Sequence, residues 1–428
     1  MIYSHKSVVF ALCAMMMVSC NRNMFNEDDY KDLVEQEQPV KGIDPSHTWE
    51  LTKQYYMTVD VGTVMPKAAR LQVLSDNPAA GESATILGDY PLDSSNKRQY
   101  IAFVAPSYMT TFYAALVDGD EKYTVMSFTS SDRSISFSRP LATNATVDER
   151  KIAKQVFSYC FEDEMPVPGD YDYNDVVLRI SQERTATNQI TLDVTLAAVG
   201  SLMQVAAALR LVNYNFDDIE SVTTVGGDTF DKDYSGKGYK KSALPFIESN
   251  DLLIKGLNGE AIINLFEDAH WATGVAKYAK EGYLPRYRYN VSKMPGPDDD
   301  LIGVRTISYV ITFKNPLTLN YFTLSNLDPF AIIEFNGALM EEHAVYKYRT
   351  VTSLHEYTQP TNAVILPWAL VVPSASFRYP LNGVNIGYAN EDALFGAYMT
   401  KNYAFGEWAA DANTAHDWYF YPTENMVY

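Results

Sequence analysis

The sequence is poor in cysteine, in basic side chains and in long apolar runs. Only 3 cysteines occur in 428 residues, and 34 Lys and Arg stand against 53 Asp and Glu, for a formal net charge of −19. Nucleic-acid binding is disfavoured, because phosphate contacts require a surplus of basic side chains. After residue 20, no segment reaches the roughly 18 uninterrupted apolar residues of a transmembrane helix, so none is expected.

The overall composition is that of a globular protein. Apolar residues make up 47% of the chain and charged residues 20%, which is typical of chains that bury a hydrophobic core. The length predicts two or three domains. The excess of carboxylates suits hard cations such as calcium rather than anionic partners.

The N-terminus has the pattern of a targeting segment. His5 and Lys6 precede an apolar run over residues 7–18, which is too short to span a bilayer and suits a secretory signal. Small residues directly before Cys20 resemble the lipobox of bacterial lipoproteins, in which that cysteine is acylated. We therefore expect removal of residues 1–19 and a lipid anchor on Cys20 in the outer membrane. An ordinary signal peptide with an incidental Cys20 is the alternative.

Residues 20–45 follow as an acidic tether with few large apolar residues, a composition that does not fold alone. Acidic residues just after the lipid cysteine serve some gut bacteria as a surface-export signal, so display on the cell surface is a further expectation; a solvated spacer is the alternative. With Cys13 removed and Cys20 acylated, only Cys160 remains. We expect Cys160 to be a buried thiol in a strand, because it lies in an apolar run over residues 157–161.

Strand signals dominate the rest of the chain, and they predict an all-β protein with two domains. Alternation over residues 56–61 and two short apolar runs around the turn at 118–121 predict an N-terminal β-sandwich over residues 46–145. Strict alternation over residues 190–196 and 306–313 predicts half-buried antiparallel strands. These belong to a larger β-rich domain over residues 150–428. Its few short helices are expected at residues 200–211, 262–272 and 391–399.

One stretch stands out for its charge. No basic residue occurs between Lys154 and Arg179, and this gap contains six carboxylates. They are Glu162, Asp163, Glu164, Asp170, Asp172 and Asp175. In a folded loop their mutual repulsion is costly without a counter-charge, and a bound cation is the simplest remedy.

The spacing of Asp170, Asp172 and Asn174 points to calcium, because alternate residues of an extended loop direct their oxygens to one side. The predicted calcium ligands are Glu162, Asp163, Asp170, Asp172, Asn174 and Asp175. An EF-hand is excluded, since Asp175 occupies the position that requires glycine, and residues 176–180 predict a strand rather than an exiting helix. The alternative is a solvated acidic turn.

The runs 161–163 and 169–175 resemble the signature that opens the LruC-type domain of lipoproteins from gut Bacteroidetes. Further resemblances follow in order at residues 197–200, 263–266, 327–330, 405–408 and 417–419. The resemblance covers residues 155–425, and the N-terminal unit resembles the β-domain that precedes this domain in such lipoproteins. That family has no established enzymatic activity. The resemblance therefore implies a surface lipoprotein of unknown function with a calcium loop.

Catalytic motifs are weak or incomplete. His355-Glu356 is not followed by the second histidine of a zinc protease, since Gln359 stands in its place. A glycoside hydrolase needs only two well-placed carboxylates, so this class stays open although no pair is singled out. We expect a non-enzymatic surface protein used in binding or adhesion.

The alternative hypothesis for the function is a carbohydrate-binding lipoprotein that captures glycans. Its main candidate sugar-stacking residues are Trp408, Trp418 and Tyr419, because aromatic faces pack against the C–H groups of sugars. Further candidates are Trp271, Trp368, Phe420 and Tyr421. The alternative for these residues is a buried core cluster. The expected partners are the membrane, through Cys20, and an extracellular protein or glycan.

Overall fold

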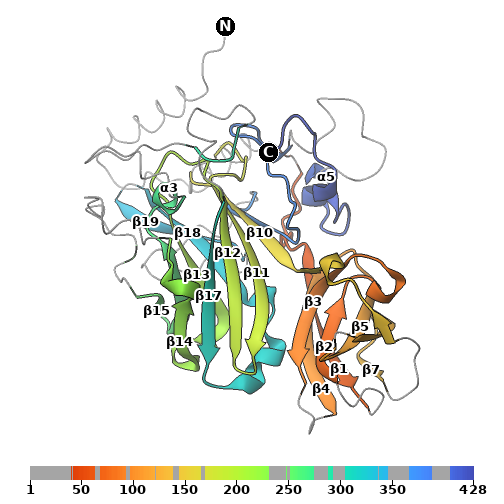
Figure 1. Ribbon diagram of the computed structural model, residues 1–428. Coiled ribbons are helices and arrows are strands. Elements are labelled where there is room, and N and C mark those ends of the chain that lie inside the picture. Colours follow the sequence, from red (N-terminus) through yellow and green to blue (C-terminus); the bar gives the residue numbers. More distant parts are fainter. Residues whose placement is uncertain are drawn as a thin grey trace, which may run out of the picture.

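The computed structural model describes residues 40, 42–62, 68–92, 97–120, 122–137, 144–164, 169–230, 247, 251–273, 288–292, 304–335, 337–345, 366–387 and 405–428. These residues form two β-sandwiches that lie side by side (Figure 1). The predicted all-β class is confirmed. Within the described residues, no helix combines the length and apolarity needed to cross a membrane.

The smaller sandwich pairs a three-stranded sheet, in the order β4-β1-β7, with a six-stranded sheet, in the order β8-β6-β5-β2-β3-β9. Its strands are β1 (Thr52–Asp60), β2 (Ala68–Leu74), β3 (Ala84–Pro91), β4 (Arg98–Pro106), β5 (Thr111–Asp118), β6 (Lys122–Thr129), β7 (Ser134–Ser136), β8 (Asn144–Thr146) and β9 (Ile152–Lys154). Two short 3-10 helices, η1 (Pro78–Ala80) and η2 (Glu149–Lys151), accompany them.

Alternation along the strands builds the core of this sandwich. Met57 and Val59 on β1 point inward and meet Leu71 and Val73 on β2, so the two sheets bury their apolar faces against each other. The turn predicted at residues 118–121 does connect the antiparallel strands β5 and β6. Strand β9 pairs with β3, so the smaller sandwich continues through Lys154.

The larger sandwich pairs a six-stranded sheet, in the order β14-β17-β12-β11-β10-β20, with a five-stranded sheet, in the order β15-β16-β13-β18-β19. Its strands are β10 (Val156–Phe161), β11 (Val176–Ala186), β12 (Gln189–Ala198), β13 (Ala206–Asn215), β14 (Ile219–Thr224), β15 (Leu253–Lys255), β16 (Glu260–Phe266), β17 (Arg305–Phe313), β18 (Leu327–Phe335), β19 (Ala338–His343) and β20 (Ala369–Val372). The helical segments are short. They are η3 (Phe216–Asp218), η4 (Val225–Gly227), α3 (Ala269–Ala272), η8 (Pro316–Tyr321), η9 (Leu324–Asn326), α5 (Phe405–Ala410) and η12 (Trp418–Phe420).

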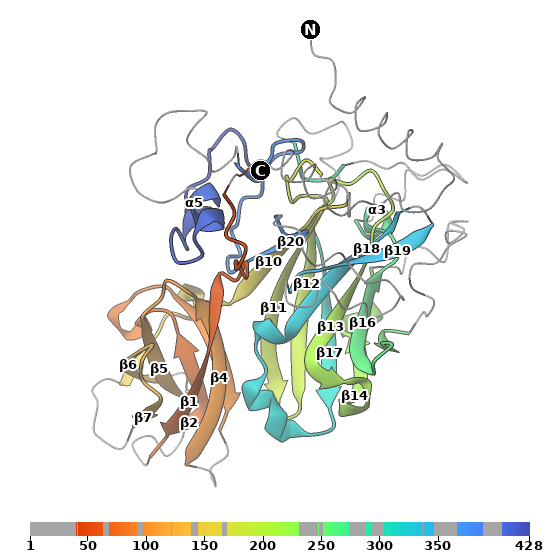
Figure 2. The same ribbon diagram turned by 180° about the vertical axis from the view of Figure 1, so that it is seen from behind.

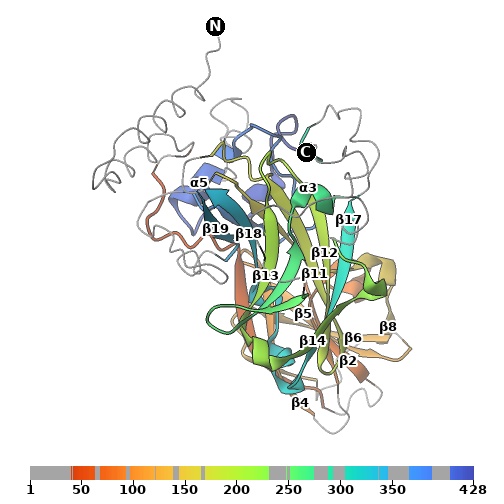
Figure 3. The ribbon, with the colours of Figure 1, turned by 90° about the vertical axis from the view of Figure 1, so that its left-hand side faces the viewer.

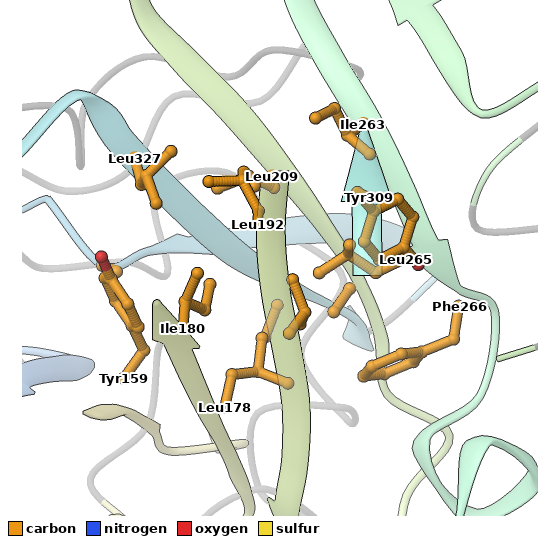
Figure 4. Close-up of a cluster of buried hydrophobic side chains, with 14 of the residues drawn as sticks. Tyr159, Leu178, Ile180, Leu192, Leu209, Ile263, Leu265, Phe266, Tyr309 and Leu327 are labelled. Atoms are coloured by element: carbon orange, nitrogen blue, oxygen red, sulfur yellow. The ribbon is translucent and has the colours of Figure 1, made fainter. Parts of the chain in front are cut away.

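The core of the larger sandwich lies between its two sheets (Figure 4). Leu178, Ile180 and Leu192 come from one sheet, and Leu209 and Ile263 come from the other. All the pairings within these two sheets are antiparallel, as the alternation at residues 190–196 and 306–313 predicts.

Two of the predicted helices are wrong over most of their length. Residues 206–211, inside the first predicted helix, belong to strand β13, and residues 262–266 of the second belong to β16, whereas its last residues, Ala269–Ala272, do form α3. Both strands are buried on both faces: Ala207 and Leu209 face the main core, while Ala206 and Ala208 pack in a second cluster behind the sheet. A continuous apolar run lacks the period of two that identifies a half-buried strand. The third predicted helix, at residues 391–399, lies outside the described residues.

A separate hydrophobic cluster, which we call the junction core, joins segments that are far apart in the sequence. It combines Trp49 from the segment before β1, Tyr171 and Tyr173 from the acidic loop, and Trp408 and Trp418 from the C-terminal segment. The backbone N–H of Asp44 donates to Ala409 O at 3.0 Å. Figures 2 and 3 show α5 and the C-terminus at one end of the molecule, together with α3.

Candidate metal site

The acidic loop, residues 162–175, connects two neighbouring strands. Strand β10 ends at Phe161 and β11 begins at Val176, and these two residues are paired in the antiparallel sheet. The loop therefore returns to the place where it began, and its carboxylates are gathered rather than spread. A strand follows the loop, as predicted, and not the exiting helix of an EF-hand.

Two tyrosines fix the path of the loop. Tyr171 and Tyr173 have φ values of +53° and +50°, a left-handed conformation that is uncommon for bulky residues. Both side chains are buried in the junction core. The Tyr173 hydroxyl donates to Pro367 O at 2.6 Å, and Tyr171 O accepts the backbone N–H of Ile386 at 2.8 Å. The strained conformation is thus held by packing and hydrogen bonds on both tyrosines.

The backbone of the loop wraps around the carboxylate of Glu162. The N–H of Tyr171 donates to Glu162 Oε2 at 3.1 Å, and the N–H of Tyr173 donates to Glu162 Oε1 at 2.6 Å. Gly169 allows this close approach, because a Cβ at that position would lie 2.6 Å from Glu162 Oε2. Burial and then the nearby charges of Asp172 and Asp170 raise the pKa of Glu162 well above its ordinary value, against the effect of the Tyr173 hydrogen bond.

Three of the predicted ligands come together. Glu162, Asp170 and Asp172 each offer a carboxylate oxygen, and these oxygens lie within 4.8 Å of one another. Glu162 and Asp172 are buried, whereas Asp170 is exposed and opens the group to solvent. Burial, followed by the charge of Asp170, raises the pKa of Asp172 to about 8. Protons or a cation can each relieve this repulsion.

Asp172 also links two loops. Its Oδ1 accepts the N–H of Asn174 at 3.2 Å, and its Oδ2 accepts the N–H of Gly383 at 2.7 Å. Each carboxylate oxygen has a second lone pair, so the same oxygens can also face an ion. Three carboxylates around one point are the hard-oxygen donor set that calcium prefers, and calcium tolerates the irregular geometry of a loop. The residues present therefore fit this metal.

Asp163 and Asp175 lie outside the group of three. Their side chains hydrogen-bond to each other, and Asp163 also hydrogen-bonds to Ser201. Burial is the main cause that raises the pKa of both carboxyl groups, while the charge of Arg288 opposes the shift at Asp163. A proton shared between the two carboxyl groups, or a cation, would relieve their repulsion. Nothing in the local sequence around residues 162–175 pointed to Ser201 or Arg288.

Asn174, the sixth predicted ligand, is directed at the backbone of other segments. Its Nδ2 donates to Pro380 O at 3.0 Å, and a Cβ on Gly200 would lie 1.9 Å from its Oδ1. The backbone N–H of Gly200 donates to Asn174 O at 2.9 Å. Asn174 thus links the acidic loop to two neighbouring segments through its Nδ2 and its backbone oxygen. Its buried Oδ1 has no hydrogen-bond partner, so the predicted role of Asn174 as a metal ligand stays a prediction.

Most of the predicted sugar-stacking residues are buried. Trp408 and Trp418 have no exposed surface and Tyr419 is 4% exposed. The two tryptophans stack on each other at 5.8 Å, and Trp49 and Phe405 pack against Trp408. The ring faces of Trp408, Trp418 and Tyr419 are therefore covered and cannot stack on a sugar. These three residues form the core cluster that is the alternative interpretation of the sequence.

Cys160 is fully buried in β10, as predicted, and burial raises the pKa of its thiol to about 12, which removes it as a nucleophile at neutral pH. Cys20, the segment around His355 and most of the tether lie outside the described residues.

Comparison with known proteins yields one family. The family model described as a domain of unknown function (DUF4842) matches residues 186–419, more than half of the chain. A crystal structure from Bacteroides ovatus, described as that of a lipoprotein, is similar with a TM-score of 0.47 and 13% identity, over 84% of this chain and 99% of that chain. No curated protein matches the chain. The family match begins within β11, so the acidic loop precedes it.

Replacing Gly200 tests the link through Asn174. Gly200→Ala places a Cβ 1.9 Å from Asn174 Oδ1 and 2.9 Å from Asn174 O, and the second atom belongs to the backbone and cannot swing away. We expect a loss of about 1–3 kcal/mol in the free energy of unfolding, measured by urea denaturation. The matched control is Gly119→Ala, whose Cβ meets no atom within 4 Å. Equal stability of the two variants would show that the packing around Asn174 is loose.

The raised pKa of Asp172 predicts a pH dependence. In chelator, the folded chain keeps a proton on Asp172 up to about pH 8, whereas the unfolded chain releases it near the ordinary value of 3.8. Stability is therefore fully present below that ordinary value and is lost as the pH rises through about 8. We expect Tm in chelator to fall over this interval. The rise in Tm on adding calcium should grow over the same interval, because protons compete with the metal. A calcium effect that shrinks as the pH rises would contradict the assignment.

Proposed function

The chain belongs to the family described as a domain of unknown function (DUF4842), and we propose that it is a calcium-stabilised lipoprotein of the bacterial cell envelope. In this proposal it acts in surface binding or adhesion and catalyses no reaction. The observation that carries the calcium part is the approach of Glu162, Asp170 and Asp172 to within 4.8 Å of one another.

Calcium fits this group better than magnesium does. Magnesium requires near-ideal octahedral geometry and retains several waters, whereas calcium accepts six to eight oxygens in an irregular shell. Glu162 and Asp172 are buried and already accept backbone N–H groups, so there is little room for a retained water shell on their side. Asp170, which is exposed, provides the solvent-facing side through which an ion would enter.

The role of the ion would be structural. By neutralising the loop it would stabilise the contacts of Tyr171 and Tyr173 in the junction core, where the N-terminal and C-terminal segments meet. Extracellular calcium modules commonly bind with Kd values of about 10⁻⁴–10⁻³ M. At a tenfold excess over Kd, mass action contributes ~1.4 kcal/mol, which is appreciable for a domain stable by ~5–15 kcal/mol.

The envelope location rests on the N-terminal sequence. The apolar run at residues 7–18 followed by Cys20 supports signal cleavage and acylation, and two or more acyl chains give stable anchoring. The acidic tether supports display beyond the outer membrane. The resemblance to LruC-type lipoproteins of gut Bacteroidetes supports the same location, and it includes the acidic loop that precedes residues 186–419.

A second candidate, glycan capture, is favoured by one observation. Although Trp408 and Trp418 are buried, three neighbouring aromatic rings are exposed at the junction of the two sandwiches: Tyr108, Phe420 and Tyr421. Glycoside hydrolysis is less favoured, because nothing in the sequence singles out a pair of carboxylates for it.

Calcium should raise the melting temperature of the protein. We propose measuring Tm for the chain without residues 1–19 and with Cys20→Ser, in chelator and in millimolar calcium. The wild type should melt higher in calcium. Asp170→Asn should lose most of this rise, because it removes one carboxylate that is exposed and leaves the buried acceptors in place. Asp172→Ala should lose it too, from a lower starting Tm, since two backbone N–H groups lose their acceptor.

The matched control is Glu220→Gln, which removes the same charge from the exposed face of β14, at the opposite edge of the sheet from β20. It should keep the full calcium response. Equal responses of Asp170→Asn and the wild type, or an equal response to magnesium, would show that the acidic loop is a solvated turn without a specific metal.

Lipidation should depend on Cys20. When the full chain is produced in a Bacteroides host fed a clickable fatty acid, we expect the label to enter the wild type and to be absent from Cys20→Ala. Cys160→Ala is the control, since that thiol is buried in β10. A labelled Cys20→Ala variant, or an unlabelled wild type in the soluble fraction, would refute the proposed anchor.

A further inference from the structure

We propose that an exposed aromatic surface, formed by Tyr108, Phe420 and Tyr421, binds an uncharged polysaccharide. This inference rests on the proposed role in surface binding and names the class of its ligand. Phe420 and Tyr421 are among the candidate sugar-stacking residues of the sequence, whereas Tyr108 is not. The surface is built from both sandwiches and lies outside the junction core.

The three rings are exposed together. Tyr108 is 43% exposed, Phe420 49% and Tyr421 46%. The ring of Phe420 lies 6.0 Å from that of Tyr108 and 6.5 Å from that of Tyr421. Single exposed apolar side chains are ordinary, but contiguous ones mark sites of interaction. Phe420 has no polar group to compensate for its contact with water, so covering its ring with a ligand would be favourable.

The surface is held rigid from below. Phe420 packs against Tyr419 at 4.5 Å, and Tyr419 packs against the buried Trp418 at 5.8 Å. Both Tyr419 and Trp418 belong to the junction core. The Tyr421 hydroxyl donates to Asp417 Oδ2 at 3.3 Å. A platform that is already ordered loses little conformational entropy when a ligand binds.

Both sandwiches contribute to the surface. Tyr108 lies in the turn between β4 and β5 of the smaller sandwich, and the other two rings belong to η12 and the residue after it. A hydrogen bond of 2.7 Å between Ser107 Oγ and His416 Nδ1 joins the two segments beside the rings. The ring positions are therefore set by the contact between the sandwiches.

The polar groups around the rings suit sugar hydroxyls. Asp76 and Asp417 both act electrostatically on Tyr108, and their carboxylates can accept hydrogen bonds from hydroxyl groups. The tyrosine hydroxyls can donate or accept. Lys53 also lies near this surface, since it acts electrostatically on His416, but Asp411 and Asp417 act on the same histidine. Negative charge close to the rings, on a chain of net charge −19, repels uronates, sulfates and phosphates. An uncharged glycan is the complementary ligand.

Ring chemistry favours a sugar over a protein segment. The exposed set consists of aromatic rings without an aliphatic side chain among its three members. The C–H groups on one face of a pyranose carry a small positive charge and are attracted to the negative face of an aromatic ring. The rings of Tyr108 and Tyr421 stand at 74° and 80° to the ring of Phe420, with centroids 6.0 and 6.5 Å away. They offer differently oriented contacts to successive parts of one chain, which suits a polysaccharide better than a free monosaccharide.

The test is a binding measurement on the chain without residues 1–19 and with Cys20→Ser. The probes are a glycan array that carries uncharged and acidic oligosaccharides, and affinity electrophoresis in gels containing soluble uncharged polysaccharides. We expect binding to uncharged glycans. Phe420→Ala and Tyr421→Ala should each weaken it about tenfold, the loss expected for one stacked aromatic ring. Tm should be unchanged in Tyr421→Ala, which keeps the result interpretable if Phe420→Ala unfolds.

The matched control is Tyr100→Ala. Tyr100 is 52% exposed on β4 of the smaller sandwich and is not part of the proposed surface, so this variant should bind as the wild type does. The proposal is overturned if no uncharged glycan binds, if only acidic glycans bind, or if Tyr100→Ala removes binding that Phe420→Ala and Tyr421→Ala retain. None of these outcomes bears on the lipid anchor or the calcium site. The fatty-acid labelling and the calcium-dependent Tm test those two parts of the proposed function independently.

Discussion

The carboxylate of Glu162 is a negative group buried where β10 leaves the sheet, and the surrounding structure is organised to compensate for it. Two backbone N–H groups, from Tyr171 and Tyr173, point at its oxygens. To deliver them the chain adopts positive φ at both tyrosines, a cost that is offset by burying both rings. Asp170 and Asp172 then add negative charge to the same place, and this excess must be balanced by protons or by a cation.

The charge balance of the acidic loop matters because the loop packs between the N-terminal and C-terminal segments of the chain. The junction core contains the loop tyrosines, Trp49 from the N-terminal side, and Trp408 and Trp418 from the C-terminal side. Asp172 ties the loop to Gly383. The charge state of the loop therefore affects how the N-terminal and C-terminal segments pack. The exposed ring of Phe420 rests on this core through Tyr419, so the proposed ligand surface and the metal site share one support.

The sequence predicts the strands wherever one face is wet, since alternation at residues 190–196 and 306–313 identifies half-buried strands directly. It fails at β13 and β16, which are buried on both faces and show no period. The acidic loop is predicted from its lack of basic residues, and the gathering of Glu162, Asp170 and Asp172 agrees with that expectation. The roles of Asn174, Asp163 and Asp175 are not predictable in this way, because they depend on Gly200, Ser201 and Pro380, which only the fold brings near. Likewise, the local sequence cannot tell that Trp418 is buried while Phe420 is exposed.

Calorimetric titration of calcium into the chelator-treated protein is the sharpest test of the metal site. We expect saturable binding of one calcium ion per chain, with magnesium binding far more weakly, and loss of the binding heat in Asp170→Asn. No saturable heat with calcium, or the same heat in wild type and Asp170→Asn, would contradict the assignment of Glu162, Asp170 and Asp172 as a metal site. The loop would then be balanced by protons alone.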